Sequence, residues 1–281
     1  MKEALYYEKA GAYVSCRLCP HNCLIAEGKT GRCLVRRNQD GKLVAEGYGR
    51  ICSLCYDPIE KKPLRHFYPG SHILSVGSYG CNMRCSFCQN SAISQEHSPA
   101  KFYAPQELLH LSLHQPNNIG LAFTYNEPLI NVEYMLDTAP LFQEHGLKVV
   151  LVTNGLVRAE PLAALLPYVD ALNIDVKGFN AAYYRKLGGD LTTVKHTVET
   201  VAAACHVEVT TLVVPGENDS AEETEALADW LATLNPQIPL HLSRFFPRYR
   251  MTDKPPTPIE TLNELAAIAR RRLRHVYIGN V

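Results

Sequence analysis

The pattern of apolar and polar positions changes near residue 70. After it, short runs rich in Val, Leu and Ile alternate with longer stretches whose apolar residues recur at helical spacing. The short runs predict strands at 72–76, 119–123, 147–152, 171–176, 207–214, 240–245 and 276–278. The longer stretches predict helices at 105–115, 131–145, 160–166, 192–204, 221–234 and 258–272. About six strand–helix units predict an α/β fold with a curved parallel sheet and helices outside, smaller than an eight-fold barrel.

The first 70 residues show little periodicity. They contain turn sequences such as Cys-Pro-His-Asn and Glu-Gly-Lys-Thr-Gly, together with six of the ten cysteines. A loop-rich unit of this size buries little apolar surface unaided, and a bound metal would compensate for that. We therefore predict a Cys-rich, metal-binding N-terminal region at 1–70 and a core domain at 71–281.

Charge and hydropathy argue against two classes of partner. The 281 residues carry 28 basic and 28 acidic side chains, so no net charge would attract nucleic acid or an anionic membrane. The N-terminal stretch is too polar for a signal-peptide core, and no apolar run approaches the roughly 20 residues that span a bilayer. We expect a cytoplasmic protein, in which clustered cysteines indicate metal ligands rather than disulfides and the isolated Cys205 indicates a core position.

The most informative cysteine motif directly follows the first predicted strand. Cys81, Cys85 and Cys88 have the spacing C-x3-C-x2-C. A four-iron cluster usually takes four thiolates, so a loop that supplies three leaves one iron open to the amino and carboxylate groups of a substrate. The alternative is zinc, but zinc sites favour C-x2-C pairs and a closed tetrahedral shell. The spacing and its place after a strand favour the iron–sulfur cluster.

This motif resembles the signature of the radical S-adenosylmethionine (SAM) superfamily. Further phrases resemble the branch with pyruvate formate-lyase activating enzyme, and more closely the radical enzyme of the AmmeMemoRadiSam system: Cys-Arg-Leu-Cys-Pro, Thr-Tyr-Asn-Glu-Pro, Asn-Ile-Asp-Val-Lys-Gly-Phe and Val-Pro-Gly-Glu-Asn-Asp. The resemblance covers essentially the whole chain. It implies a partial (β/α)6 radical SAM barrel with a small Cys-rich N-terminal unit. It also implies a [4Fe–4S] cluster, bound SAM, and a ferredoxin or flavodoxin as electron donor.

The resemblance also implies cofactor contacts at the carboxyl ends of the predicted strands. Asn126 and Glu127 match the family segment that holds the ammonium group of SAM. Strand alternation places Asn173, Asp175 and Lys177 on one face, where the family uses the matching Asp-x-Lys to hold the cofactor. A turn in the first case and a buried ion pair in the second are the structural alternatives. Three further residues are candidate cofactor contacts by the same resemblance: Phe87, Asn154 and His241.

Three positions depart from the activating-enzyme pattern. Tyr-Asn at 125–126 replaces Gly-Gly, Val152 replaces an Asp that helps to bind a monovalent cation, and Thr210 replaces an Arg. Farther along the chain, Arg244 is a candidate contact for an anionic substrate, together with Arg248 and Arg250. A solvated basic loop is the alternative for these arginines.

The six cysteines before residue 70 predict a second metal site. Zinc would take four of them, and a second iron–sulfur cluster is the alternative, although the related enzymes carry extra clusters after the main motif. Free buried thiols are the remaining interpretation. The spacing does not identify the four ligands among Cys16, Cys19, Cys23, Cys33, Cys52 and Cys55.

Three functions follow from these features. The first is a radical SAM enzyme that cleaves SAM reductively and abstracts hydrogen from a small molecule or partner protein of an AmmeMemoRadiSam-type pathway. The second is an activase that generates a glycyl radical on a pyruvate formate-lyase-like enzyme. The third is a metal-binding interaction protein without catalysis. The departures at 125–126, Val152 and Thr210 favour the first function.

Overall fold

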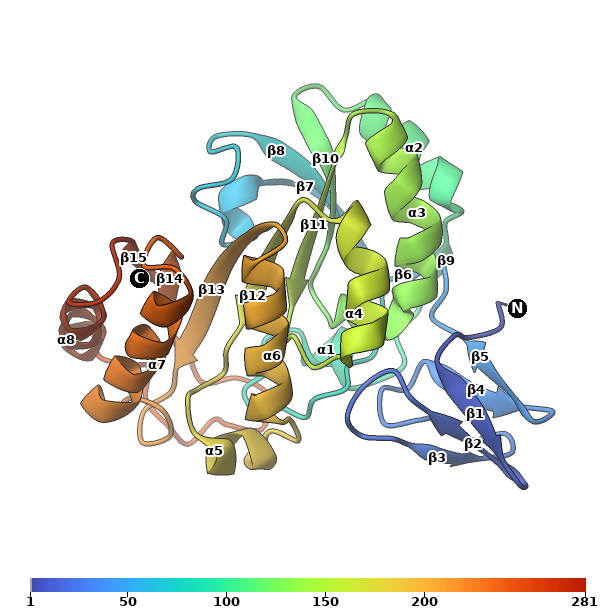
Figure 1. Ribbon diagram of the computed structural model, residues 1–281, viewed down its shortest axis with the longest axis horizontal. Coiled ribbons are helices and arrows are strands. Elements are labelled where there is room, and N and C mark those ends of the chain that lie inside the picture. Colours follow the sequence, from blue (N-terminus) through green and yellow to red (C-terminus); the bar gives the residue numbers. More distant parts are fainter. Residues whose placement is uncertain (1) are drawn as a thin grey trace.

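The computed structural model describes residues 2–281 and contains one large curved sheet. Its strands are β7 (Ser53–Pro58), β8 (His72–Gly77), β10 (Asn118–Phe123), β11 (Lys148–Thr153), β12 (Ala171–Asp175), β13 (His206–Val213), β14 (Leu240–Arg244) and β15 (Val276–Gly279). They lie in the order β15-β14-β13-β12-β11-β10-β8-β7 (Figure 1). Neighbouring strands pair in parallel from β8 to β15, and only the edge strand β7 pairs antiparallel, with β8.

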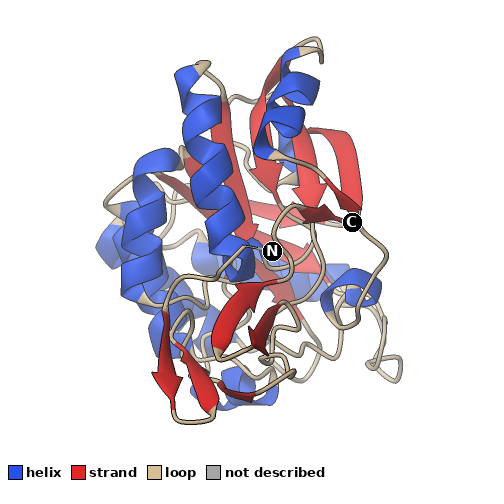
Figure 2. Ribbon diagram, turned by 90° about the vertical axis from the view of Figure 1, so that its right-hand side faces the viewer, coloured by secondary structure: helices blue, strands red, loops and turns tan. Residues whose placement is uncertain are grey.

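Helices connect the parallel strands. They are α1 (Ser91–Ser94), α2 (Pro105–Leu113), α3 (Val132–Glu144), α4 (Ala159–Leu165), α5 (Ala181–Lys186), α6 (Leu191–Ala202), α7 (Ala221–Leu234) and α8 (Ile259–Ala269). Side chains of Asp190 and Ser220 cap the N-termini of α6 and α7. The longer helices lie in front of the sheet in Figure 1 and beside it in Figure 2. The predicted α/β class is confirmed.

The N-terminal residues form small sheets of their own. β1 (Tyr7–Ala10), β2 (Tyr13–Cys16) and β3 (Leu24–Ala26) make one sheet, and β4 (Arg36–Gln39) pairs with β5 (Lys42–Ala45). We call these five strands, together with the loops between them (residues 7–45), the N-terminal unit. β6 (Arg50–Ile51) pairs instead with β9 (Lys101–Phe102). The division at residue 70 stays a prediction, because β7 lies before that residue and nevertheless pairs with β8 after it.

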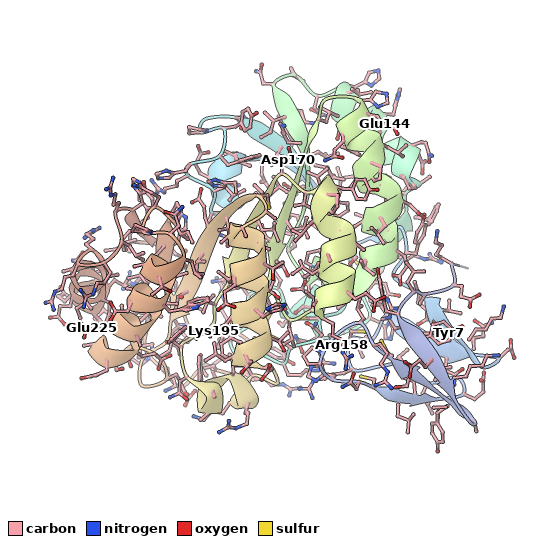
Figure 3. The ribbon with its side chains drawn as sticks, viewed as in Figure 1. Tyr7, Glu144, Arg158, Asp170, Lys195 and Glu225 are labelled. Atoms are coloured by element: carbon pink, nitrogen blue, oxygen red, sulfur yellow. The ribbon has the colours of Figure 1, made fainter. Side chains whose placement is uncertain are left out.

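Buried polar contacts attach the N-terminal unit to the core. The guanidinium of Arg36 on β4 donates to both carboxylate oxygens of Glu133 on α3, at 2.8 and 3.1 Å. Both side chains are almost fully buried. At the start of α4, Arg158 lies close to the unit (Figure 3), and its backbone N–H donates to the carbonyl of Leu18 at 3.0 Å. The unit is therefore fixed against two helices of the core.

Polar side chains are buried near the amino ends of the central strands. Glu208 on β13 accepts hydrogen bonds from the rings of His241 at 2.6 Å and His206 at 3.0 Å, and from the backbone N–H of His66 at 2.7 Å. Burial opposes ionisation of Glu208, but these donors outweigh it and lower its pKa to about 2. The carboxylate is therefore charged and fully paired inside the sheet.

Glu208→Gln is expected to reduce the free energy of unfolding at neutral pH by about 1.5–3 kcal/mol, the contribution of a hydrogen bond to a buried charge. Because the pKa of Glu208 is lowered in the folded state, its stabilisation is complete above the ordinary carboxyl pKa. It is lost as the pH falls from about 4.5 towards 2. Urea unfolding between pH 7 and pH 3 should show this acid loss in the wild type, and a smaller loss in the variant. If the free energy of unfolding fell equally with pH in the wild type and in the variant, Glu208 would not be the group responsible for the acid loss.

No helix within residues 2–281 is long and apolar enough to cross a bilayer.

Candidate functional site

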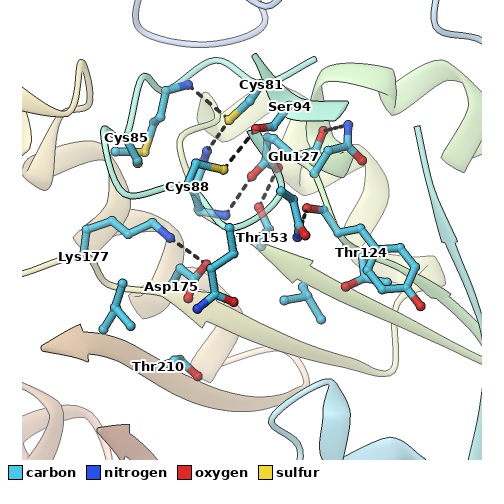
Figure 4. A pocket seen from close by; sticks show the side chains of 18 of the residues that line it. Cys81, Cys85, Cys88, Ser94, Thr124, Glu127, Thr153, Asp175, Lys177 and Thr210 are labelled. Carbon is cyan, nitrogen blue, oxygen red and sulfur yellow. Dashed lines mark hydrogen bonds and ion pairs between the residues drawn. The ribbon is translucent and has the colours of Figure 1, made fainter. Parts of the chain in front are cut away.

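The three cysteines of the C-x3-C-x2-C motif lie in the loop that follows β8, at the carboxyl edge of the sheet. All three line a cavity of about 310 Å³, the size of a small-molecule site. In Figure 4, Cys81, Cys85 and Cys88 lie together on one side of this cavity, facing Glu127 and the Asp175–Lys177 pair. Segments distant in sequence are thus brought to one cavity, as expected where parallel strands end.

The chemistry of these thiols fits a thiolate-binding metal group. Burial raises the pKa of Cys81, and it raises that of Cys85 to about 11. Without a cation the two thiols are neutral at pH 7, and a metal would stabilise their thiolates. The backbone N–H of Met83 already donates to the Cys81 sulfur at 3.3 Å, and Ser94 lies 3.1 Å from the Cys88 sulfur.

Within residues 2–281, no group of three or more His, Cys, Asp or Glu side chains is arranged to hold a metal ion as it stands.

Glu127 is the buried carboxylate of the site. Its oxygens accept hydrogen bonds from the Thr153 hydroxyl at 2.7 Å and from the backbone N–H groups of Asn154 at 2.7 Å and Leu129 at 3.0 Å. Burial is the largest influence and raises the pKa of Glu127 to about 7. Three of its roughly four acceptor positions are occupied, so one is left for a cationic ligand group.

Two asparagines fix the cysteine loop. The Asn126 side chain accepts from the backbone N–H of Ser78 at 3.1 Å and donates to the carbonyl of Gly80 at 2.9 Å. The Asn154 amide donates to the side chain of Asn82 at 2.9 Å and lies 3.7 Å from the Cys81 sulfur. Both residues line the cavity, but their side chains are engaged with the protein. The two side chains therefore position the loop. Only the backbone of Asn126 remains available to contact a ligand.

Asp175 and Lys177 form the ion pair of the site, with Nζ and Oδ2 2.8 Å apart. Burial disfavours the ammonium of Lys177, but the neighbouring Asp175 carboxylate outweighs it and raises the lysine pKa. Both side chains line the same cavity as the cysteines. The pair therefore presents a permanent cation and a carboxylate to any ligand there.

The structure separates the remaining candidates. Phe87 is buried and lines the cavity, and its contact with the adenine stays a prediction. His241 does not line it; two residues farther along β14, Ser243 does. Instead, the His241 ring forms a hydrogen bond with Glu208. Its position therefore gives no support for a contact with a ligand in the cavity. Arg244 is also outside the lining, where its Nε donates to the carbonyl of Thr257 at 2.8 Å.

Sequence reasoning missed a polar group on the opposite wall. Tyr125 lines the cavity, and its hydroxyl donates to Asp57 on β7. Lys62 lies 2.8 Å from the same carboxylate and 4.6 Å from the centre of the Tyr125 ring. Burial opposes ionisation of Asp57, but these two donors lower its pKa to about 2. The departure from Gly-Gly at Tyr125 was the only available signal, and its φ of 69° is one that glycine adopts freely.

These features define a partial α/β barrel with a three-thiol loop at the carboxyl end of its first parallel strand. A sequence model of the Radical SAM superfamily matches residues 75–231, and the chain belongs to that superfamily. It is 43% identical over 295 residues to "Uncharacterized protein MJ0808" of Methanocaldococcus jannaschii, covering 100% of this chain and 86% of that protein.

Solved structures show the same fold. A radical SAM methyltransferase from Sphaerobacter thermophilus superposes with a TM-score of 0.56 at 17% identity, over 75% of this chain and 67% of that one. SuiB from Streptococcus suis gives a TM-score of 0.56 at 14% identity, over 73% of this chain and 48% of SuiB. The fold is thus the partial barrel of this superfamily, and membership implies a [4Fe–4S] cluster and SAM.

Lys177→Met is expected to weaken SAM binding by roughly 10- to 100-fold, the effect of losing one hydrogen bond from a buried charge. The measurement is equilibrium dialysis of SAM against protein with a reconstituted cluster. His241→Asn is the control, because His241 is polar and buried in β14 but lies outside the cavity lining. Equal losses in the two variants would show that the cavity does not hold the cofactor through Lys177.

Proposed function

We propose that this protein cleaves SAM reductively and abstracts a hydrogen atom from a substrate of an AmmeMemoRadiSam-type pathway. One observation carries the proposal: three thiols, a buried carboxylate and an ion pair line one cavity at the carboxyl edge of the sheet. A ferredoxin or flavodoxin is the proposed electron donor, and the cytoplasm is the proposed location.

Cys81, Cys85 and Cys88 would hold the [4Fe–4S] cluster. The cluster and SAM, when bound, supply the one-electron chemistry that yields a 5′-deoxyadenosyl radical. The protein's own residues bind and orient. Glu127 and the backbone of Asn126 would accept hydrogen bonds from the ammonium group.

Lys177 would pair with the cofactor's carboxylate or ribose, oriented by Asp175. The burial of these groups excludes water from the place where a radical would form. Phe87, buried in the lining, would meet the adenine.

The substrate class rests on the walls of the cavity. Val152 and Thr210 both line it, so neither an Asp carboxylate nor an Arg guanidinium is available at these positions. Tyr125 adds an aromatic ring and a hydroxyl where the activating enzymes have glycine. These side chains favour a substrate other than a glycyl-radical enzyme, namely a small molecule or partner protein of the AmmeMemoRadiSam pathway. Arg244 stays a candidate for contacting an anionic part of that substrate outside the cavity.

The test is an anaerobic assay of 5′-deoxyadenosine with a reduced electron donor. We expect slow cleavage without substrate and faster cleavage with the protein or metabolite fraction of the pathway, with deuterium transferred from labelled substrate into 5′-deoxyadenosine. A glycyl-radical signal on a pyruvate formate-lyase-like partner would establish the activase instead. A colourless protein that binds neither iron nor SAM would support the non-catalytic interaction protein.

A further inference from the structure

The N-terminal unit gathers four of the six upstream cysteines around a second, small cavity. Cys16 ends β2, Cys19 and Cys23 lie in the loop from β2 to β3, and Cys33 lies in the loop before β4. All four line one enclosed space of about 10 Å³. Cys52 borders a different surface groove, and Cys55 is exposed on β7. The fold therefore distinguishes four candidate metal ligands among the six cysteines, which the spacing in the sequence could not do.

We propose that Cys16, Cys19, Cys23 and Cys33 bind one divalent ion of the zinc class as four thiolates, and that this ion holds the loop carrying Cys81. A closed shell of four thiolates is a preferred arrangement for structural zinc. The cavity is large enough for about one small ion or water, and too small for a four-iron cube.

A backbone donor already points at one of these sulfurs. The N–H of Arg32 donates to the Cys23 sulfur at 3.5 Å, as the N–H of Met83 does to the Cys81 sulfur at 3.3 Å in the loop of the main site. Such a donor stabilises a thiolate more than a thiol, so it is expected where a sulfur is to bind a metal.

Positive charge also borders the cavity. Arg36 lines it, and its Nε is buried without a partner, although its other nitrogens are paired with Glu133 and the Leu5 carbonyl. Arg32 lies on the same lining. Four thiolates around a divalent ion carry a net charge of about −2. Glu133 already neutralises the charge of Arg36, so Arg32 would offset part of this charge, and the unpartnered Nε–H of Arg36 would donate a hydrogen bond to a thiolate.

The four thiols do not yet form a closed shell, because no group of three ligands within residues 2–281 is arranged to hold an ion as it stands. Closure requires the sulfurs to turn towards the cavity, which rotation about the Cα–Cβ bond of each cysteine allows.

The cavity is directly continuous with the cysteine loop of the main site. Asn82, which follows Cys81, lines the cavity, and its carbonyl is 2.8 Å from the ring nitrogen of His21. The carbonyl of Cys33 lies so close to Gly80 that a Cβ there would approach it to 2.3 Å. An ion that fixes these loops therefore also fixes the start of the cluster-binding loop.

The test is zinc and iron analysis of anaerobically purified full-length protein. We expect one zinc per chain in the wild type and in Cys81→Ala/Cys85→Ala/Cys88→Ala, which separates this site from the proposed catalytic cluster. Cys19→Ser and Cys33→Ser should lose the zinc and reconstitute less iron, whereas Cys52→Ser and Cys205→Ser should retain both. Zinc retained in Cys19→Ser and Cys33→Ser, or iron rather than zinc in the triple variant, would overturn the proposal.

A measurement on wild-type protein covers the case in which the ligand variants fail to fold. Cobalt replacing zinc should show the intense visible bands of a tetrahedral tetrathiolate site, and a mercurial should release one ion as four thiols react. Cobalt spectra without thiolate charge-transfer bands would contradict the four-sulfur assignment.

Discussion

Cys85→Ala is expected to form no 5′-deoxyadenosine above background under reducing, anaerobic conditions. Cys85 is the middle residue of the three-thiol loop, and it is 8% exposed, so solvent cannot readily supply a replacement ligand. Its loss removes one of the three thiolates that would hold the cluster, and a cube with two open irons is easily degraded. We also expect the iron content to fall, while zinc in the N-terminal unit persists.

The control for this result is Cys205→Ala. Cys205 lies between α6 and β13, partly buried, and does not line the cavity. Its removal should leave both iron content and SAM cleavage at wild-type levels. Undiminished 5′-deoxyadenosine formation by Cys85→Ala would refute the cluster assignment, whatever the fate of the second metal.

The sequence was sufficient for those parts of the site that depend on local order. Alternation put Asp175, the last residue of β12, and Lys177, two residues beyond it, on one side, and both line the cavity. Asn173, predicted on the same face, does not line it and donates to the carbonyl of Pro63 at 2.9 Å. The loop of three cysteines is likewise set by chain order alone. Glu127 and Asn154 were named by the family resemblance, and the rule that parallel strands end at one edge explains why both line the cavity.

Position along a strand could not be read in the same way. His241 and Ser243 share a face of β14, but only Ser243 reaches the cavity. How far the cavity extends into the barrel depends on packing between strands, and the sequence of one strand does not contain that information. His241 was named by the family resemblance as the nearest histidine, and the structure pairs it with Glu208, outside the cavity lining.

Long-range contacts were also beyond the sequence. Asp57 and Lys62 lie in the region assigned to the Cys-rich unit, yet they meet Tyr125, some 60 residues later, across the cavity wall. They do so because β7 joins the sheet as an antiparallel edge, and no periodicity in residues 1–70 indicated that pairing. The selection of four cysteines among six depends on tertiary folding for the same reason.

Glu133→Ala is expected to lower the free energy of unfolding by about 3–5 kcal/mol, the cost of leaving one partner of a buried ion pair uncompensated. The Arg36 guanidinium would keep its charge in a site where it is 1% exposed, and the backbone N–H of Leu5 would also lose its acceptor, now 2.7 Å away. Because Arg36 borders the four-cysteine cavity, we expect the N-terminal unit to become sensitive to protease first.

The measurement is urea unfolding of proteins with matched metal content. The slope of the unfolding free energy against urea concentration should be the same for all variants, so that a shift in midpoint reports stability. Glu8→Ala is the matched control: its pair with Arg17 spans 2.8 Å, but the side chains are 64% and 38% exposed, so we expect a loss below about 1 kcal/mol. Replacing both partners, in Arg36→Met/Glu133→Leu, should recover most of the stability, because no unpaired charge then remains buried. A loss in Glu133→Ala no larger than that in Glu8→Ala would mean that the buried pair does not hold the N-terminal unit against α3.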